Sequence, residues 1–191
     1  ARRSDHHRCA GAGGSTLIVR RTPALSARLV LALVVGCSMV NACSDTKGTS
    51  VAEVPFTAAD GSTTAVADFE GAPLVVNMWA TNCVPCVKEM PALDEVATEM
   101  VGRLQIIGVN VFDTPQNAAA FAADLGVSYP QFTDPDGGLS TALAVTGLPA
   151  TAFFDADGKL VDVHQGAYTA DELRAAIEQH LPALVPEGTS P

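Results

Sequence analysis

The sequence is poor in basic residues, in aromatic residues and in long apolar runs. Only 17% of its 191 residues are charged and 5% are aromatic, and six of the eleven Lys and Arg residues precede residue 43. The rest of the chain carries 5 basic and 20 acidic side chains, a formal charge of −15. Such a surface repels phosphate backbones and anionic headgroups, which argues against nucleic-acid binding. The hydrophobic residues, 48% of the chain, suffice for one sizeable core, so we expect a single domain.

The N-terminal region lacks the roughly 20 predominantly apolar residues that a membrane-spanning helix needs. A short apolar stretch, Leu29–Val35, follows three arginine residues and leads into small residues. This order is typical of a secretory signal peptide, which we place at residues 1–42. Residues 1–18 add nothing that a signal peptide requires, and Val19 is an alternative start. The alternative interpretation of the whole region is an uncleaved N-terminal anchor.

Two cysteines at the end of this leader lie in stretches that resemble the lipobox, in which a cysteine is acylated and becomes the mature N-terminus. Cys43 is preferred over Cys37 because a fuller apolar run precedes it and small polar residues follow it. We therefore expect Cys43 to be lipidated and residues 43–53 to form a flexible tether. The protein would then be extracytoplasmic, anchored to the outer face of the cytoplasmic membrane as a lipoprotein; secretion without an anchor is the alternative.

Alternating strand and helix patterns fill residues 54–184, the predicted domain, and residues 185–191 are predicted to be a disordered tail. Short, mostly apolar runs bounded by turn residues indicate strands, and apolar spacings of three and four indicate helices. The predicted strands are 54–58 and 63–66 (an edge hairpin), 74–78, 104–111, 129–133, and 150–154 and 160–164 (a second hairpin). The predicted helices are 83–100, kinked at Pro91, 114–125, 139–145 and 169–181. This alternation predicts an α/β fold.

The sequence Cys83-Val-Pro-Cys86 stands where the third predicted strand gives way to a helix. Two cysteines separated by two residues can close a small disulfide ring. The unpaired N–H groups and the positive end of the dipole at a helix N-terminus favour the thiolate of the first cysteine. We therefore predict that Cys83 attacks and that Cys86, one turn further along, resolves the mixed disulfide. Pro85 suits the first helical turn because it has no N–H to lose.

A metal site is the competing interpretation of this pair. Zinc usually takes four Cys or His ligands in two pairs, and the chain has no second pair. Cys9, Cys37 and Cys43 belong to the leader, and His164 and His180 stand alone. We expect no metal and no cofactor. A copper-binding or metallochaperone role is the alternative from another class, although no Met-rich or His-rich segment accompanies the pair.

Two stretches carry a resemblance to a known family. Trp79-Ala-Thr-Asn-Cys83-Val-Pro-Cys86-Val-Lys-Glu89-Met-Pro91-Ala-Leu93, together with Gly147-Leu-Pro149-Ala-Thr151, resembles the TlpA/ResA-type branch of the thioredoxin superfamily. The resemblance covers nearly everything from Phe56 to Leu181. It implies a thioredoxin-like fold, with a central mixed sheet flanked by helices, an N-terminal hairpin and a central helix-strand insert. It also implies thiol-disulfide exchange.

The resemblance assigns roles to four further residues. Pro149 would be the cis proline that faces the disulfide, and Leu148 would present backbone groups to a substrate strand. Thioredoxins carry a buried Asp where this chain has Asn77, and an amide cannot accept a proton from Cys86. Glu89 matches a glutamate that does related work in ResA-like proteins. Its spacing alone is also consistent with a solvated carboxylate on the helix surface.

Two residues before the cysteine pair are candidates for substrate contact. Asn82 stands where the family commonly has an aromatic residue, which would leave Cys83 more open and change which substrates dock. Trp79 is the second candidate, with core packing as its alternative role.

The predicted function is the reduction of disulfides in exported proteins, with apocytochrome c a client implied by the resemblance and a membrane electron-transfer thiol protein as partner. The dipeptide Val84-Pro85 lacks the histidine of strongly oxidising relatives, which favours a reducing role. A disulfide-forming oxidase is the alternative within the same chemistry. A peroxidase is disfavoured, because peroxiredoxins place a threonine three residues before the attacking cysteine, whereas Thr81 lies two before Cys83.

Overall fold

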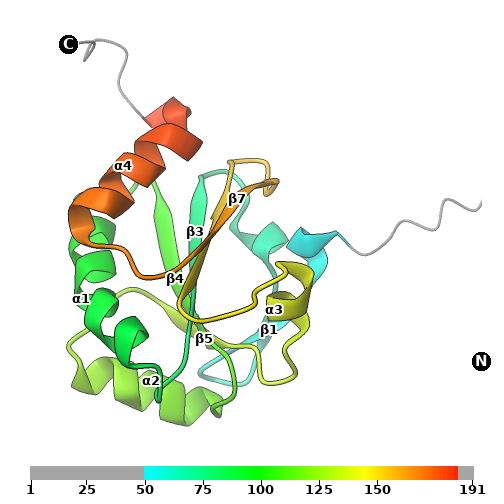
Figure 1. The fold of residues 1–191 in the computed structure, drawn as a ribbon. Coiled ribbons are helices and arrows are strands. Elements are labelled where there is room, and N and C mark those ends of the chain that lie inside the picture. Colours follow the sequence, from blue (N-terminus) through cyan, green and yellow to red (C-terminus); the bar gives the residue numbers. More distant parts are fainter. Residues whose placement is uncertain (1–49, 185–191) are drawn as a thin grey trace, which may run out of the picture. The chain divides into compact units, whose positions relative to one another are not determined.

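The computed structural model describes residues 50–184, which form a seven-stranded sheet with helices on both faces (Figure 1). The strands are β1 (Phe56–Ala58), β2 (Thr63–Thr64), β3 (Leu74–Trp79), β4 (Gln105–Asn110), β5 (Gln131–Thr133), β6 (Ala150–Phe154) and β7 (Leu160–Gln165). The helices are α1 (Val84–Glu99), α2 (Pro115–Asp124), α3 (Gly138–Ala142) and α4 (Ala170–His180), with 3-10 turns η1 (Val51–Glu53), η2 (Val66–Phe69) and η3 (Pro182–Leu184). The predicted signal peptide, both candidate lipidation cysteines and the predicted tail lie outside the described residues.

The sheet is mixed, in the order β2-β1-β5-β4-β3-β6-β7. Strands β3, β4 and β5 run parallel, while the N-terminal hairpin and the β6–β7 hairpin pair antiparallel on either side of them. Helix α2 and strand β5 form the predicted central insert, and β5 joins the N-terminal hairpin to the centre of the sheet. The predicted thioredoxin-like fold class is confirmed.

The alternation of side chains along β3 divides the core into two layers. Val76 and Met78 belong to a cluster shared with η2 and α3, while Val75 belongs to a cluster shared with α1 and α4. Figure 1 shows the same division, with α1, α2 and α4 on one side of the strands and α3 with η1 and η2 on the other. Because both faces of β3 are covered, all six of its residues are buried and its sequence is an almost continuous apolar run.

Most boundaries agree with the sequence-based expectation to within two residues, and two differ by more. Within the described residues, the 3-10 turn η1 stands where the predicted tether ends. Ser50 accepts from the Ala52 N–H and donates its own N–H to Glu53, which closes a capping box. Helix α3 ends at Ala142, three residues before the predicted end, and Ala144 then takes a left-handed φ of 54°. Helix α1 continues through Pro91. None of the helices within residues 50–184 is both long enough and apolar enough to cross a bilayer.

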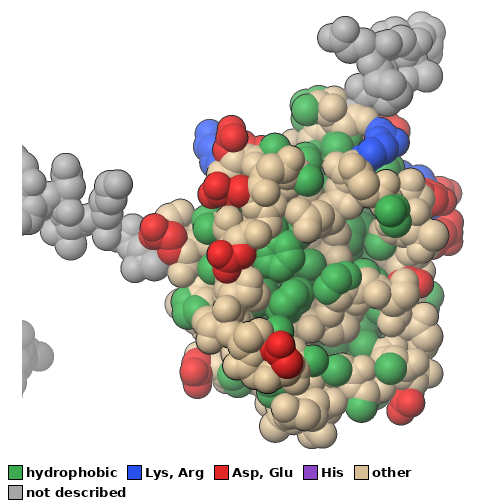
Figure 2. Space-filling view, turned by 180° about the vertical axis from the view of Figure 1, so that it is seen from behind, with side chains coloured by type: hydrophobic (Ala, Val, Ile, Leu, Met, Phe, Trp, Pro, Cys, Tyr) green, Lys and Arg blue, Asp and Glu red, His purple; other side chains and the backbone are tan. Residues whose placement is uncertain are grey.

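Negative charge spreads over the described surface. Figure 2 shows acidic side chains scattered around a central band of hydrophobic side chains, with few basic ones. Arg174 is one of the four basic residues in this part of the chain, and it joins α4 to α1 through ion pairs with Glu95 and with Glu99, the latter at 2.6 Å. Because these partners are exposed to solvent, which screens their charges, such pairs add little stability.

Candidate active site

The two cysteines lie where β3 ends and α1 begins. They form a disulfide with a Cα–Cα distance of 5.3 Å. Cys83 is the N-cap residue of α1, and its sulfur accepts a hydrogen bond from the Cys86 N–H at 3.3 Å. Cys83 is partly exposed, whereas Cys86 is fully buried. The geometry therefore leaves one sulfur open to a large partner and shields the other.

The loop that carries Cys83 is tied to the neighbouring strand. Asp113, which follows β4, accepts hydrogen bonds from the Thr81 hydroxyl at 3.0 Å and from the Thr81 N–H at 3.4 Å. The Asp113 N–H donates to Asn110 Oδ1 at 3.0 Å, and the Val111 N–H donates to the Trp79 carbonyl at 2.9 Å. No sequence pattern pointed to Asp113, because its partner lies 32 residues away.

The loop before β6 faces the same site. The Leu148–Pro149 peptide bond is cis, as the resemblance implied. Leu148 and Cys83 both pack against the cluster that contains Trp79, Cys86 and Met90, so the proline loop and the disulfide meet over one apolar patch. The Pro149 carbonyl accepts from the Gly166 N–H at 2.9 Å, which ties this loop to the end of β7.

Glu89 lies beneath the cysteine pair and is buried, with only 2% of its surface exposed. Its carboxylate accepts from Asn77 Nδ2 at 2.6 Å and from the Tyr168 N–H at 2.9 Å. Burial raises the pKa of Glu89 to about 7, and the two hydrogen bonds offset only part of that rise. The interpretation of Glu89 as a solvated surface carboxylate is therefore wrong, because α1 turns this residue toward the sheet.

Comparison with known proteins identifies the family. Residues 45–179 match the Redoxin family. The chain belongs to that family. The thiol:disulfide interchange protein DsbE of Pseudomonas fluorescens biotype C is 35% identical over 122 residues, which are 63% of this chain and 67% of that protein. The thiol-disulfide oxidoreductase ResA of Geobacillus thermodenitrificans is 31% identical over 120 residues, 62% of this chain and 67% of that protein.

Solved structures agree with this assignment. MTB DsbF, in its mixed oxidised and reduced forms, superposes with a TM-score of 0.61 at 28% identity, covering 71% of this chain and 97% of that one. The exposed lipoprotein thioredoxin of Streptococcus pneumoniae gives 0.55 at 27% identity, covering 65% and 97%. This redoxin is a thioredoxin-like thiol-disulfide oxidoreductase of the TlpA/ResA type, as the motifs predicted.

Trp79 corrects one predicted role in this redoxin. Its side chain is fully buried, so it cannot contact a substrate directly. The indole N–H donates to Gln131 Oε1 at 3.0 Å. Gln131 reaches across β4 at Gly108, where a Cβ atom would lie 2.2 Å from the same oxygen. Trp79 is thus an internal anchor for the strand that precedes Cys83, and Gln131 is a contributor that the sequence did not reveal.

The surface beside Asn82 is hollowed. A depression of about 490 Å³ is lined by Thr81, Asn82, Asp113, Asn117, Ala120, Phe121 and Asp124. Asn82 is exposed and lies at this depression, so its predicted contact with substrate remains a proposal. The lining includes two carboxylates and neither Lys nor Arg, which gives this side of the site a negative character.

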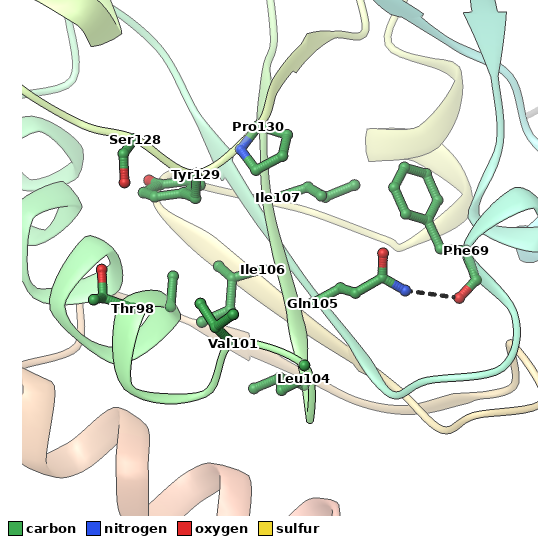
Figure 3. Close-up of a pocket in the computed structure, with 12 residues that line it drawn as sticks. Phe69, Thr98, Val101, Leu104, Gln105, Ile106, Ile107, Ser128, Tyr129 and Pro130 are labelled. Carbon is green, nitrogen blue, oxygen red and sulfur yellow. Dashed lines mark hydrogen bonds between the residues drawn. The ribbon is translucent and has the colours of Figure 1, made fainter.

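A second pocket, of about 300 Å³, lies away from the disulfide (Figure 3). Its lining comes from the start of β4, the turn after α1, the residues before β5, and Phe69, whose carbonyl accepts from Gln105 Nε2 at 3.0 Å. Cys83 stands at the opposite end of the parallel strands, after the carboxyl end of β3, so this pocket is separate from the redox site. Within residues 50–184 no group of three or more His, Cys, Asp or Glu side chains is placed to hold a metal ion.

Proposed function

We propose that this redoxin is an extracytoplasmic reductase that resolves disulfides in exported proteins, apocytochrome c among them, through Cys83 and Cys86. The observation that carries the proposal is the arrangement of one open sulfur, one buried sulfur and a buried carboxylate on the same helix. Cys86 and Glu89 are three residues apart on α1, so they share one helix face.

The proposed reaction begins with the reduced protein. The Cys83 thiolate attacks one sulfur of the client disulfide, which forms a mixed disulfide and releases the first client thiolate. Cys86 then gives its proton to Glu89, and the Cys86 thiolate attacks the Cys83 sulfur. The second client thiolate leaves with the electron pair of the broken bond. The client gains two electrons and takes up two protons, one from Cys86 by way of Glu89 and one from water, and the protein holds the Cys83–Cys86 disulfide. A membrane thiol protein would return the two electrons.

The proposed roles of Leu148 and Pro149 follow from their position. Leu148 packs against the same apolar cluster as Cys83. The backbone of Leu148 can there pair with an extended client segment beside the sulfur that is attacked.

The proposed location rests on the N-terminal sequence and on named relatives. The basic, apolar and small-residue order before Cys43 supports export and lipidation. One similar structure is described as an exposed lipoprotein thioredoxin. Anchoring through Cys43 would hold the redox site close to the membrane, within reach of a membrane electron donor.

The reduction potential of the Cys83–Cys86 couple tests the direction of electron flow. We expect equilibration against dithiothreitol and glutathione to give a potential below about −200 mV, the range of reducing thioredoxin-like proteins. A value near that of a strong oxidant, about −120 mV, would refute the reducing role and favour the disulfide-forming oxidase. Titration of the reduced protein with Cu(I) separates the metallochaperone alternative, which requires tight stoichiometric binding.

A further inference from the structure

Large hydrophobic side chains are exposed at both ends of the parallel strands. The described residues include four such side chains: Val84 (63% exposed), Val101 (76%), Phe112 (79%) and Val161 (43%). Phe112 and Val84 belong to the segments that follow β4 and β3, at the end that carries the disulfide. Val101 belongs to the turn after α1, on the wall of the separate pocket.

Phe112 is held in an unusual backbone conformation. Its φ is +108°, a region that favours glycine and is strained for an aromatic residue. Both flanking residues are fixed by hydrogen bonds, Val111 to the Trp79 carbonyl and Asp113 to Thr81 and Asn110. Strain of this kind persists only where the surroundings impose it, and it concentrates at functional sites. The hydrogen bonds of Val111 and Asp113 therefore hold the backbone in a turn from which the Phe112 ring is exposed to solvent.

The loop that carries Phe112 lies beside the loop that carries the open sulfur of Cys83. In the parallel pairing of β3 with β4, Trp79 lies opposite Asn110, so the loops that continue to Cys83 and to Phe112 leave the sheet side by side. The contact between Asp113 and Thr81 joins the two loops directly. An extended polypeptide whose cysteine reaches Cys83 can therefore continue over the neighbouring loop that carries Phe112.

We infer that Phe112 is a docking residue for an extended client polypeptide that carries an apolar side chain beside its reactive cysteine and a basic side chain beyond it. The inference rests on the proposed function and names the substrate class of that site. The apolar side chain would cover the exposed ring. The basic side chain would lie in the depression lined by Asp113 and Asp124.

Charge argues for a client rather than for a second copy of this chain. The described residues carry four basic and eighteen acidic side chains. Two such surfaces repel each other, whereas a segment with a net positive charge is attracted. The preformed turn also lowers the cost of binding, because the backbone that carries the ring is already held by hydrogen bonds.

The test compares peptides and variants in one assay. The substrates are short peptides closed by a disulfide, with Leu or Ser beside one cysteine and Lys or Glu further along. The reduced protein is the reductant in each reaction. The small neutral substrate 2-hydroxyethyl disulfide reports on the thiols alone. Phe112→Gly removes the ring and relaxes the backbone at a positive φ, Phe112→Leu keeps an apolar side chain, and Val101→Ser is the matched control with an equally exposed apolar residue.

We expect the wild type to reduce the Leu-Lys peptide faster than the Ser-Glu peptide. In Phe112→Gly the ratio of kcat/KM for the Leu-Lys peptide to that for the small disulfide should fall about tenfold, the loss expected when an aromatic ring no longer covers apolar surface. Phe112→Leu should recover most of that ratio, and Val101→Ser should retain all of it. Thermal unfolding should show Phe112→Gly to be at least as stable as the wild type, because the strain is relieved.

Several outcomes overturn the inference. An unchanged ratio in Phe112→Gly removes Phe112 from docking, and an equal loss with both substrates shows that it supports the Cys83 loop instead. Concentration-dependent dimers that disappear in Phe112→Gly assign the ring to a second copy of the chain. If the wild type reduces none of the disulfides, the proposed function itself is contradicted. This outcome differs from failure of the Phe112 inference, in which the wild type remains active.

Discussion

Replacement of Glu89 by glutamine tests the buried carboxylate through the pH dependence of stability. The folded-state pKa of Glu89 is about 7, compared with 4.5 for a free glutamate. Between these values the folded protein keeps its proton while the unfolded chain releases it, so stability falls as the pH rises from 4.5 to 7. The difference of 2.5 pKa units corresponds to about 3 kcal/mol at 1.36 kcal/mol per unit.

Glutamine removes this pH dependence and keeps the shape of the side chain. Its carbonyl can accept from the Tyr168 N–H, and its amide can donate to Asn77 Oδ1, which has no hydrogen-bond partner, once the Asn77 amide rotates. We expect equal stabilities near pH 4. At pH 8 the Glu89→Gln protein should be the more stable, by up to about 3 kcal/mol.

Urea unfolding of the oxidised protein across pH 4 to 8 measures this difference, with the disulfide intact in every sample. Glu178→Gln on the exposed face of α4 is the control, because it makes the same chemical change at an exposed position. A Glu89→Gln difference that is constant, or that favours the wild type as the pH rises, would refute a carboxylate that resists ionisation in the folded state.

The same variant tests the proton step proposed for Glu89. In the reduced protein, loss of the carboxylate removes the acceptor for the Cys86 proton. We expect the rate of mixed-disulfide resolution to lose its inflection near pH 7, while far-UV circular dichroism shows an unchanged fold. Superimposable pH profiles for Glu89→Gln and the wild type would mean that the thiol exchanges its proton directly with water.

Three further predictions concern the thiols, the N-terminus and the core. Cys86→Ser should accumulate mixed disulfides with exported clients, visible as high-mass bands that disappear on reduction, because it lacks the resolving thiol, and Cys83→Ser should trap none; equal trapping would reverse the roles. Mass spectrometry of the mature N-terminus should show an acylated Cys43, and an unmodified Ser44 start would end that proposal. Gly108→Ala should lower the free energy of unfolding by about 1–3 kcal/mol, because the new methyl group displaces Gln131 from the Trp79 indole. In a Gln131→Ala background the same substitution should cost less, and denaturant unfolding of the single and double mutants measures the difference.

The sequence predicts the elements of this fold better than it predicts their mutual contacts. Cys83 and Cys86 can be predicted from the sequence because the disulfide, the N-cap and the first helical turn all lie within four residues. The strands around them are equally local signals, since the apolar run of β3 follows from burial on both faces. Element boundaries differ where a side chain outside the pattern intervenes, as Ser50 does at η1.

The parts that local patterns missed are long-range contacts. The spacing of Glu89 is also consistent with a surface residue. Its buried position becomes evident only from its contact with the Tyr168 N–H, 79 residues away. The positive φ of Phe112 has no signature in the sequence, because Phe is among the residues least suited to that conformation. Trp79 was a candidate for substrate contact with core packing as its alternative role, and its burial follows from the α1 and α2 residues that cover this end of β3.

Burial raises the pKa of Glu89 to about 7, and the identity of residue 77 decides how much of that rise is offset. Asn77 and the Tyr168 amide are both neutral donors, so they offset only part of the cost of burying the charge. An ammonium or guanidinium group in place of Asn77 would pull the pKa of Glu89 well below neutrality and leave a carboxylate too weakly basic to take a proton from a thiol. An aspartate there would place two carboxylates side by side and hold Glu89 protonated. With the neutral amide of Asn77, the pKa of Glu89 stays at about 7. Near neutral pH the carboxyl group can then both accept a proton from Cys86 and return it, as thiol-disulfide exchange in either direction requires.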